Sequence, residues 1–468
     1  MTRSGRQPRP SWPSTVAGLF SGIFAFFVVP GQDVRAVLYE PRLWLLAAFV
    51  VCWAVAAFVS DRETSLRDLP RKFATLPIYE RLLLAYMGAM VLASLLSPVP
   101  GFAFLGDSIT LTGSLFQFLL FGIFFVFRRI SNPESVLRAL AACTLALALI
   151  NVAESLGARP ALVFFPETYS DAYPRAGIGR ESVIVGLYVL LAGMASASVL
   201  QPRISRGLAY AWLLAAFVGV ALNPGKAGWL AILAVLVLVL VAAVVTRRQR
   251  VLLNLVACVA AAALVSLSVS GLAARIGVSG PGLEERVATS TTLETRLLLW
   301  KASWRMLLER PLLGWGDDNF KLEVFDHLSS QEAARLCRLE YGVLPEHETR
   351  AFGNVCMMQD EDGNLIGLTG IDYIWPHNIL AQIAVSHGVV GLGLFVAFLV
   401  SLAVAVAHGG QGRWVWLVGP AGFLVYLMGF FYIVPIAPYF WLCLGIASNP
   451  AISSRPQHGS PLARPACA

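Results

Sequence analysis

Long apolar runs alternate with short polar stretches through most of this chain. A helix that crosses a bilayer needs about 20 mainly apolar residues, and the apolar runs approach or exceed that length. The pattern predicts twelve spans, at residues 14–30, 42–59, 81–97, 114–127, 136–156, 182–200, 207–222, 227–245, 251–273, 377–407, 414–432 and 435–448. We therefore expect an all-α polytopic membrane protein with about 12 transmembrane helices.

Composition agrees with this class. Hydrophobic residues make up 57% of the chain and charged residues 13%, whereas soluble domains average about 25% charged residues. The net charge of +7 does not indicate a nucleic-acid partner, because most basic residues fall in short loops between the apolar runs. We expect the surface of the protein to contact a lipid bilayer.

Charge in the loops predicts the orientation of the spans, because cytoplasmic loops carry an excess of Lys and Arg. With the N-terminus in the cytoplasm, every second loop is basic, whereas the outward loop 98–113 contains neither Lys nor Arg. The cytoplasmic bases are Arg62, Arg67, Arg71, Lys72, Arg128, Arg129, Arg203, Arg206, Arg247, Arg248 and Arg250. Both termini are predicted to be cytoplasmic.

This orientation divides the chain into four parts. Residues 1–273 hold the first nine predicted spans, and residues 274–376 form one large outward loop, which is periplasmic if the cell is a Gram-negative bacterium. Residues 377–448 hold the last three spans. The tail 449–468 is rich in Pro and Ser, which predicts disorder.

The outward loop begins with an amphipathic pattern. Residues 293–310 read as a helix that Thr292 can cap, with apolar residues interleaved with bases, which is typical of a helix in the membrane interface. For the rest of the loop, to Ile374, we expect short helices and loops. Cys337 and Cys356 could form a disulfide there if the loop faces an oxidising compartment.

The end of that loop carries the strongest candidate for chemistry. The stretch Trp375-Pro376-His377-Asn378 lies where the polar segment meets the next span. A histidine can exchange a proton near neutral pH, so His377 is the candidate catalytic residue. Trp375 and Asn378 are candidate supporting residues.

Several bases on the predicted outward face oppose the orientation rule. They are Arg175, Arg180, Lys226 and Arg296. Arginine binds phosphate through a planar fork and lysine binds it as a point charge, so this set fits a diphosphate-linked lipid. Lipid headgroups, or ion pairs with an acid such as Glu167 or Glu181, are the alternative explanation. Arg305, on the same predicted helix as Arg296, is a further supporting candidate.

Acidic residues give little sign of a metal. Asp317-Asp318 resembles a metal-binding pair, but it follows the Gly314-Trp315-Gly316 turn and is expected to cap the next helix. We predict no metal and no cofactor. His387, one helical stretch after His377, is expected to be a packing or lining residue.

Three sequence motifs lie between residues 170 and 395. One runs from Thr295-Arg296 through Trp300 to Arg310-Pro-Leu-Leu-Gly-Trp-Gly316-Asp-Asp-Asn-Phe320. The second is His377-Asn378-Ile-Leu-Ala-Gln382 followed by His387-Gly388-Val-Val-Gly391-Leu392, and the third is Pro174-Arg175-Ala-Gly177. Together these motifs resemble the bacterial O-antigen ligase and polymerase superfamily. The family commonly has Ser-Arg where this chain has Gly225-Lys226, so Lys226 keeps the charge but lacks the bidentate geometry.

The resemblance implies a glycosyltransferase of the GT-C kind in the bacterial inner membrane, with its active site on the periplasmic face. Its donor would be an undecaprenyl-diphosphate-linked glycan, and its acceptor a sugar hydroxyl of lipid A-core. Related polymerases extend another repeat unit, and related oligosaccharyltransferases modify proteins. The layout of spans favours the ligase.

These residues suggest one mechanism. His377 would act as general base for the acceptor hydroxyl, while Arg175, Arg180, Lys226 and Arg296 stabilise the diphosphate leaving group in a metal-independent, inverting displacement. A transporter is the alternative from another class. It is disfavoured because transporters place charges near the membrane midplane, and these spans are nearly free of charge except at Glu154.

Overall fold

Helices dominate the structure, and each predicted span coincides with one of them. This computed structural model describes residues 12–27, 39–60, 73–107, 110–158, 181–223, 226–277, 291–341, 348–352, 355–359, 365–370, 375–410, 412–430 and 432–452. Of the predicted disordered tail, residues 453–468 lie outside this description. Because no water reaches the core of a bilayer, a spanning segment must satisfy its backbone polar groups internally, as an α-helix does.

The helices at the predicted spans are, in chain order, α1 (Trp12–Ile23), α2 (Glu40–Ser60), α4 (Ile78–Leu95), α6 (Ser114–Arg129), α7 (Pro133–Ser155), α9 (Glu181–Leu200), α10 (Arg206–Leu222), α11 (Lys226–Val245), α12 (Gln249–Arg275), α17 (Ile379–His408), α18 (Val418–Leu427) and α19 (Ala437–Ser448). The short helix α5 (Pro100–Leu105) lies between α4 and α6.

Length and composition support a polytopic membrane protein. Within the described residues, six helices are long and apolar enough to cross a membrane, and further apolar helices are shorter. The six are the helices at 40–57, 78–95, 133–155, 227–245, 250–275 and 379–408. The number of twelve crossings stays a prediction.

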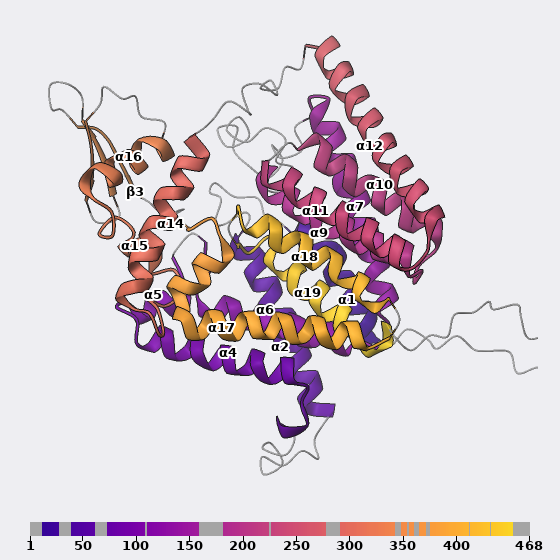
Figure 1. Cartoon of the computed structure of the whole chain (residues 1–468), viewed down its shortest axis with the longest axis horizontal. Helices are drawn as coiled ribbons and strands as arrows, with labels where there is room; N and C mark the ends of the chain where they lie inside the picture. The colour runs from indigo at the N-terminus through magenta and orange to yellow at the C-terminus, as the bar shows by residue number, and fades with distance from the viewer. Residues whose placement is uncertain are drawn as a thin grey trace, which may run out of the picture.

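Helix α17, which begins directly after His377-Asn378, packs against several other helices. In Figure 1, α4 and α17 run side by side, and α6 and α19, which pack against each other, are seen above them. Aromatic rings fill the space between these helices: Trp441 of α19 stacks on Phe398 of α17 at 5.7 Å and meets Phe121 of α6 edge-on at 4.8 Å. This packing fixes the middle of α17, after position 388, relative to α6 and α19.

The predicted outward loop forms a small folded unit at one end of the bundle (Figure 1). It contains α14 (Thr291–Glu309), α15 (Phe320–Glu323), α16 (Ser330–Tyr341) and an antiparallel sheet of β1 (Glu348–Phe352), β2 (Val355–Gln359) and β3 (Leu365–Gly370) in the order β1-β2-β3. The expectation of only short helices and loops is therefore wrong for these three strands. Cys337 of α16 and Cys356 of β2 form a disulfide that joins the helix to the sheet.

Two apolar faces distinguish α14. Leu299, Ala302 and Met306 are fully buried against the folded loop, whereas another set of large apolar side chains is exposed. The exposed set is Leu293, Leu297, Trp304 and Leu308, each at least 54% accessible. Exposed apolar side chains that share a helix face commonly mark a membrane or protein contact. The interfacial position of α14 stays a prediction.

Candidate functional site

His377 is held by contacts to the residues around it. Trp300 of α14 donates its indole N–H to the carbonyl of Pro376 at 2.8 Å. On the other side, Asn378 is the N-cap of α17 and accepts from the amides of Leu380 and Ala381 at 3.0 and 3.3 Å. His377 itself has φ +50°, a left-handed conformation that costs a non-glycine residue free energy and often marks functional sites.

The His377 imidazole is uncharged at neutral pH. Burial, and then the positive charge of Arg296, lower the pKa of His377 from 6.5 to about 4. The ring lies edge-on to Phe430, 6.5 Å between centroids. At neutral pH the imidazole therefore carries no charge.

Arg296 supplies a cation beside this imidazole. It extends from α14 towards α18, where its guanidinium lies near Gly429. Among the described residues it forms no ion pair, and its buried Nε has no hydrogen-bond partner. Because a desolvated cation without a counter-charge is costly, this arrangement favours an anionic ligand.

The loop Pro311–Gly316 and helix α17 are joined by hydrogen bonds between their backbones. Helix α17 is interrupted at Gly388, which has φ 65° and ψ −168°. The amides of Trp315 and Gly316 donate to the carbonyls of Val385 and Ser386 just before the break, both at 2.8 Å. After the break, the amides of Val389 and Val390 donate to the carbonyls of Pro311 and Leu312 at 2.8 and 3.3 Å. The Pro311–Gly316 loop thus replaces hydrogen bonds that the helix loses.

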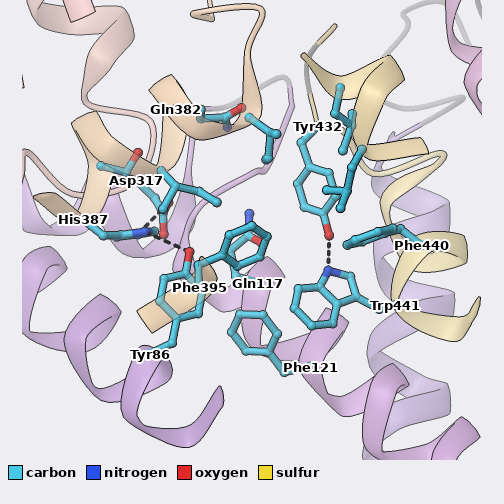
Figure 2. A pocket seen from close by; sticks show the side chains of 15 residues that line it. Tyr86, Gln117, Phe121, Asp317, Gln382, His387, Phe395, Tyr432, Phe440 and Trp441 are labelled. Atoms are coloured by element: carbon cyan, nitrogen blue, oxygen red, sulfur yellow. Dashed lines mark hydrogen bonds and ion pairs between the residues drawn. The ribbon is translucent and has the colours of Figure 1, made fainter. Parts of the chain in front are cut away.

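This docking brings a second histidine against a carboxylate. His387 Nε2 lies 3.1 Å from Asp317 Oδ1, and His387 Nδ1 lies 3.1 Å from the hydroxyl of Tyr86 on α4 (Figure 2). The other oxygen of Asp317 accepts from Ser114 at 2.6 Å. The expectation that His387 lines or packs the core is confirmed, since it is 2% exposed.

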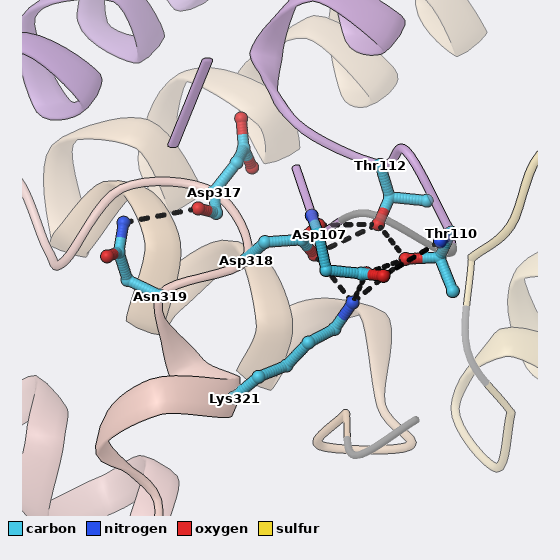
Figure 3. Close-up of polar contacts among 7 residues, drawn as sticks. All are labelled: Asp107, Thr110, Thr112, Asp317, Asp318, Asn319 and Lys321. Atoms are coloured by element: carbon cyan, nitrogen blue, oxygen red, sulfur yellow. Dashed lines mark hydrogen bonds and ion pairs between the residues drawn. The ribbon is translucent and has the colours of Figure 1, made fainter. Parts of the chain in front are cut away.

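A buried lysine joins the same loop to the turn between α5 and α6. Lys321 is 2% exposed and pairs with Asp107 and Asp318 (Figure 3). Its ammonium also lies 4.0 Å from the centroid of the Trp375 ring, two residues before His377. Burial raises the pKa of Asp318, whereas at Asp107 the ammonium and hydrogen bonds outweigh burial and lower the pKa. The cluster therefore holds both the Asp317–Lys321 turn and Trp375.

We expect Lys321→Met to destabilise the protein strongly. The substitution leaves two buried carboxylates without their cation, and breaking a buried pair in this way costs about 3–5 kcal/mol. The matched control is Lys301→Met, because Lys301 is half exposed in its pair with Glu332 and such pairs contribute about 0–1 kcal/mol. The apparent unfolding temperature in detergent should fall clearly for the first variant and little for the second. Equal values would contradict the assigned role of Lys321.

The structure brings together some of the predicted site residues. His377, Asn378, Trp375 and Arg296 lie together at the start of α17. Lys226 begins α11, but its side chain, Arg175 and Arg180 lie outside the described residues, so their convergence on His377 stays a prediction.

Arg305 and the aspartate pair both make contacts within the fold. Arg305 donates to the carbonyl of His327 at 2.7 Å and pairs with Glu332 at 3.2 Å, so it fixes α16 on α14. The expectation that Asp317-Asp318 caps α15 is wrong, because the cap position is Asn319 and no side chain caps it. Both carboxylates instead bond across the fold. Within the described residues, no group of three or more His, Cys, Asp or Glu side chains could hold a metal ion.

The sequence does not predict several residues of the site, namely Tyr86, Asp107 and Lys321. It also does not predict the contact between Asp317 and His387. One signal was available, since Asp107 is an acid in the outward loop 98–113 that has no Lys or Arg. An acid in a loop without bases is consistent with a cation supplied from elsewhere in the chain, and Lys321 is that cation.

These features define a polytopic membrane protein in which a neutral histidine lies next to an arginine from the folded segment that precedes α17. Residues 209–396, which run from α10 into α17, match the family model described as O-antigen ligase (Wzy_C). This match assigns that segment to the O-antigen ligase superfamily and confirms the resemblance seen in the motifs. It supports an enzyme of the membrane glycosyltransferase type, either ligase or polymerase. No curated protein matches the chain.

Proposed function

We propose that this protein is an O-antigen ligase of the bacterial inner membrane. It transfers a glycan from undecaprenyl diphosphate to a sugar hydroxyl of lipid A-core on the periplasmic face. The observation that carries the proposal is the neutral His377 next to Arg296, a half-buried cation without an ion-pair partner among the described residues. Together they offer a base for a hydroxyl and a charge for a diphosphate.

The reaction balances as a single displacement. The acceptor oxygen attacks the anomeric carbon, its proton passes to the His377 imidazole, and the bond from that carbon to the diphosphate oxygen breaks. The leaving group is undecaprenyl diphosphate, which departs with the electron pair and is stabilised by Arg296. In the proposal, Arg175, Arg180 and Lys226 add to this charge, the reaction needs no metal, and the configuration at the anomeric carbon inverts.

Arg296 also links donor binding to base strength. In the free protein, burial and Arg296 hold the pKa of His377 at about 4, which makes the imidazole a weak base. A bound diphosphate neutralises Arg296 and places negative charge nearby, and opposite charge favours the protonated imidazole. Donor binding therefore raises the pKa of His377 and strengthens the base once the substrate is present.

A pH profile tests this link. Neutral His377 is the active form, so activity falls as pH falls through its pKa. In kcat/KM, which reports the free enzyme, we expect the acid limb near pH 4, and in kcat, which reports the complex, at a higher pH. Arg296→Gln should lower the rate and move the limb in kcat/KM upward. A limb near 6.5 that Arg296→Gln does not move would contradict the coupling.

The disulfide and the fold of the loop support the location. Disulfides persist in oxidising compartments such as the periplasm, and Cys337–Cys356 lies in the loop that precedes His377. Basic cytoplasmic loops point to the same orientation, with both termini in the cytoplasm.

The second candidate function is that of the polymerase of the same superfamily. A third is protein O-oligosaccharyltransfer. The family match favours neither alternative over the ligase. Deletion of the gene in its host, followed by electrophoresis of the lipopolysaccharide, separates the first two. A ligase predicts cores without any O-antigen and polymer that stays on the lipid carrier. Cores that carry one repeat unit would identify a polymerase instead.

A further inference from the structure

Three polar side chains are buried between α7, α9 and α10, towards the predicted outward ends of these helices. They are Asn151, Tyr188 and Asn223, and each is at most 1% exposed. Asn223 Nδ2 donates to Asn151 Oδ1 at 2.6 Å and to the carbonyl of Gly219 at 2.8 Å. The Tyr188 hydroxyl donates to the same Asn151 oxygen at 3.3 Å. Polar side chains inside a membrane bundle are costly and commonly functional, and the proposed reaction has so far given these three no part.

Asn223 ends one helix just before another begins. It is the C-cap residue of α10, and α11 begins at Lys226. Stability alone does not account for the network, because Asn151 Nδ2 and Asn223 Oδ1 have no hydrogen-bond partner among the described residues. An unpaired buried polar atom costs free energy, which an apolar contact between the same helices would avoid. The network therefore serves to fix a position.

The first turns of α9 carry this position from α10 to α11. A methyl group on Gly219 of α10 would lie 2.3 Å from the ring of Tyr188 on α9. In the same way, a methyl group on Gly228 of α11 would lie 2.1 Å from Val185 on α9. Both contacts are too close for any residue but glycine, so the start of α11 cannot shift independently of the hydrogen-bonded network.

The start of α11 lies beside Arg296. In Figure 1, α11 is seen next to α9 and α18, and it packs against both. A methyl group on Gly429, just after α18, would lie 3.3 Å from Ala227 Cβ and 3.8 Å from Arg296 Nη1. Ala227 directly follows Lys226 in the first turn of α11. The helix that carries Lys226 thus begins next to the guanidinium whose charge acts on His377.

We infer that Asn223 is a positioning residue for the donor site. It fixes the start of α11 so that Lys226 and Arg296 can flank one diphosphate. The inference rests on the proposed function for the identity of this anion. Because Asn223 has no part in the contacts that hold His377, its loss should weaken donor binding and leave proton transfer intact.

A disulfide cross-link measures the position of α11 without any substrate. Two Cβ atoms about 3.5–4.5 Å apart can be joined by a disulfide, and Ala227 Cβ would lie 3.3 Å from a Cβ atom at Gly429. The parent variant Ala227→Cys with Gly429→Cys, full-length and in nanodiscs, should therefore cross-link on mild oxidation. Mass spectrometry of its peptides identifies the bond.

In that parent, Asn223→Leu should slow cross-linking about tenfold, because reactions between held groups depend steeply on their alignment. Asn223→Ala removes the same two hydrogen bonds without adding volume and should act in the same direction. The matched control is Asn254→Leu. Asn254 of α12 donates to Tyr210 of α10 at 2.7 Å, near the other end of α10, so its loss should leave the cross-linking rate unchanged.

Kinetics test whether the position matters to the donor. Asn223→Leu should raise KM for the undecaprenyl-diphosphate-linked glycan about tenfold, as for the loss of one hydrogen bond to a charged group. The KM for lipid A-core and kcat should not change. Lys226→Met should have the same effect, and the double variant should be no worse than either single variant, because residues that act through each other are not additive.

Additive effects of Asn223→Leu and Lys226→Met would show that Asn223 only stabilises the fold, and would overturn the inference. Absence of a cross-link in the parent variant, or equal cross-linking with and without Asn223, would overturn it as well. The proposed function fails on a different result, full transfer by His377→Gln. Since cross-linking needs no substrate, it decides the inference whichever way that result falls.

Discussion

Replacing His377 by Gln is expected to lower the rate of glycan transfer by about 10²–10⁴-fold, the usual contribution of a general base. Glutamine retains a hydrogen-bonding group of similar reach but cannot accept the proton of the acceptor hydroxyl. The Arg296 side chain and the Asn378 cap do not depend on the imidazole, so donor binding should persist. The measurement is single-turnover transfer by the purified protein at pH 8, where the wild-type imidazole is fully neutral.

The matched control is His408→Gln, because His408 lies exposed at the far end of α17. It should leave the rate unchanged. Near full activity of His377→Gln at pH 8 would refute the base assignment and leave His377 a binding or positioning role.

The second large effect is expected from Gly388→Ala at the break in α17. A methyl group on Gly388 would lie 2.2 Å from the carbonyl oxygen of Leu312, and its φ and ψ are nearly exclusive to glycine. The loop Pro311–Gly316 must then separate from α17, which displaces both His387 and Asp317. A misplacement of about 1 Å can cost about 10²-fold in rate, so we expect a loss of that order together with a lower unfolding temperature.

Gly393→Ala is the matched control on the same helix. No atom lies within 4 Å of a methyl group at Gly393, and alanine favours an α-helix by about 1 kcal/mol over glycine. This variant should be as active and at least as stable as the wild type. If Gly388→Ala behaved like Gly393→Ala, the docking of the two motifs would not be needed for the site.

Much of the bundle could be predicted from hydropathy alone. Apolar runs such as 227–245 and 251–273 admit only a helix when lipid surrounds them, and α11 and α12 lie there. The resemblance of the motifs also indicates that His377 and Arg296 belong to one site, and the structure places them next to each other.

The sheet was missed although the sequence contains a signal for it. Two runs suited to strands, Glu348–Phe352 and Val355–Gln359, are separated by Gly353-Asn354, and a two-residue connection of this kind is typical of a hairpin. The unusual density of polar residues around the runs favoured the interpretation as loops.

Contacts between distant segments could not be predicted at all. Lys321 and Asp107 are 214 residues apart, and Tyr86 and His387 are 301 apart. No periodicity within one element reports such pairs. The break at Gly388 is similar, because its hydrogen bonds join backbone groups, which every sequence contains, to a loop whose position depends on the whole fold.

The central claim is tested most directly by reconstituted transfer. The purified protein in proteoliposomes would receive undecaprenyl-diphosphate-linked glycan and lipid A-core, and the products would be separated by mass. The account predicts lipid A-core that carries the glycan, together with free undecaprenyl diphosphate, from the wild type and not from His377→Gln. Glycan that only lengthens on its lipid carrier, or equal product from both proteins, would contradict it.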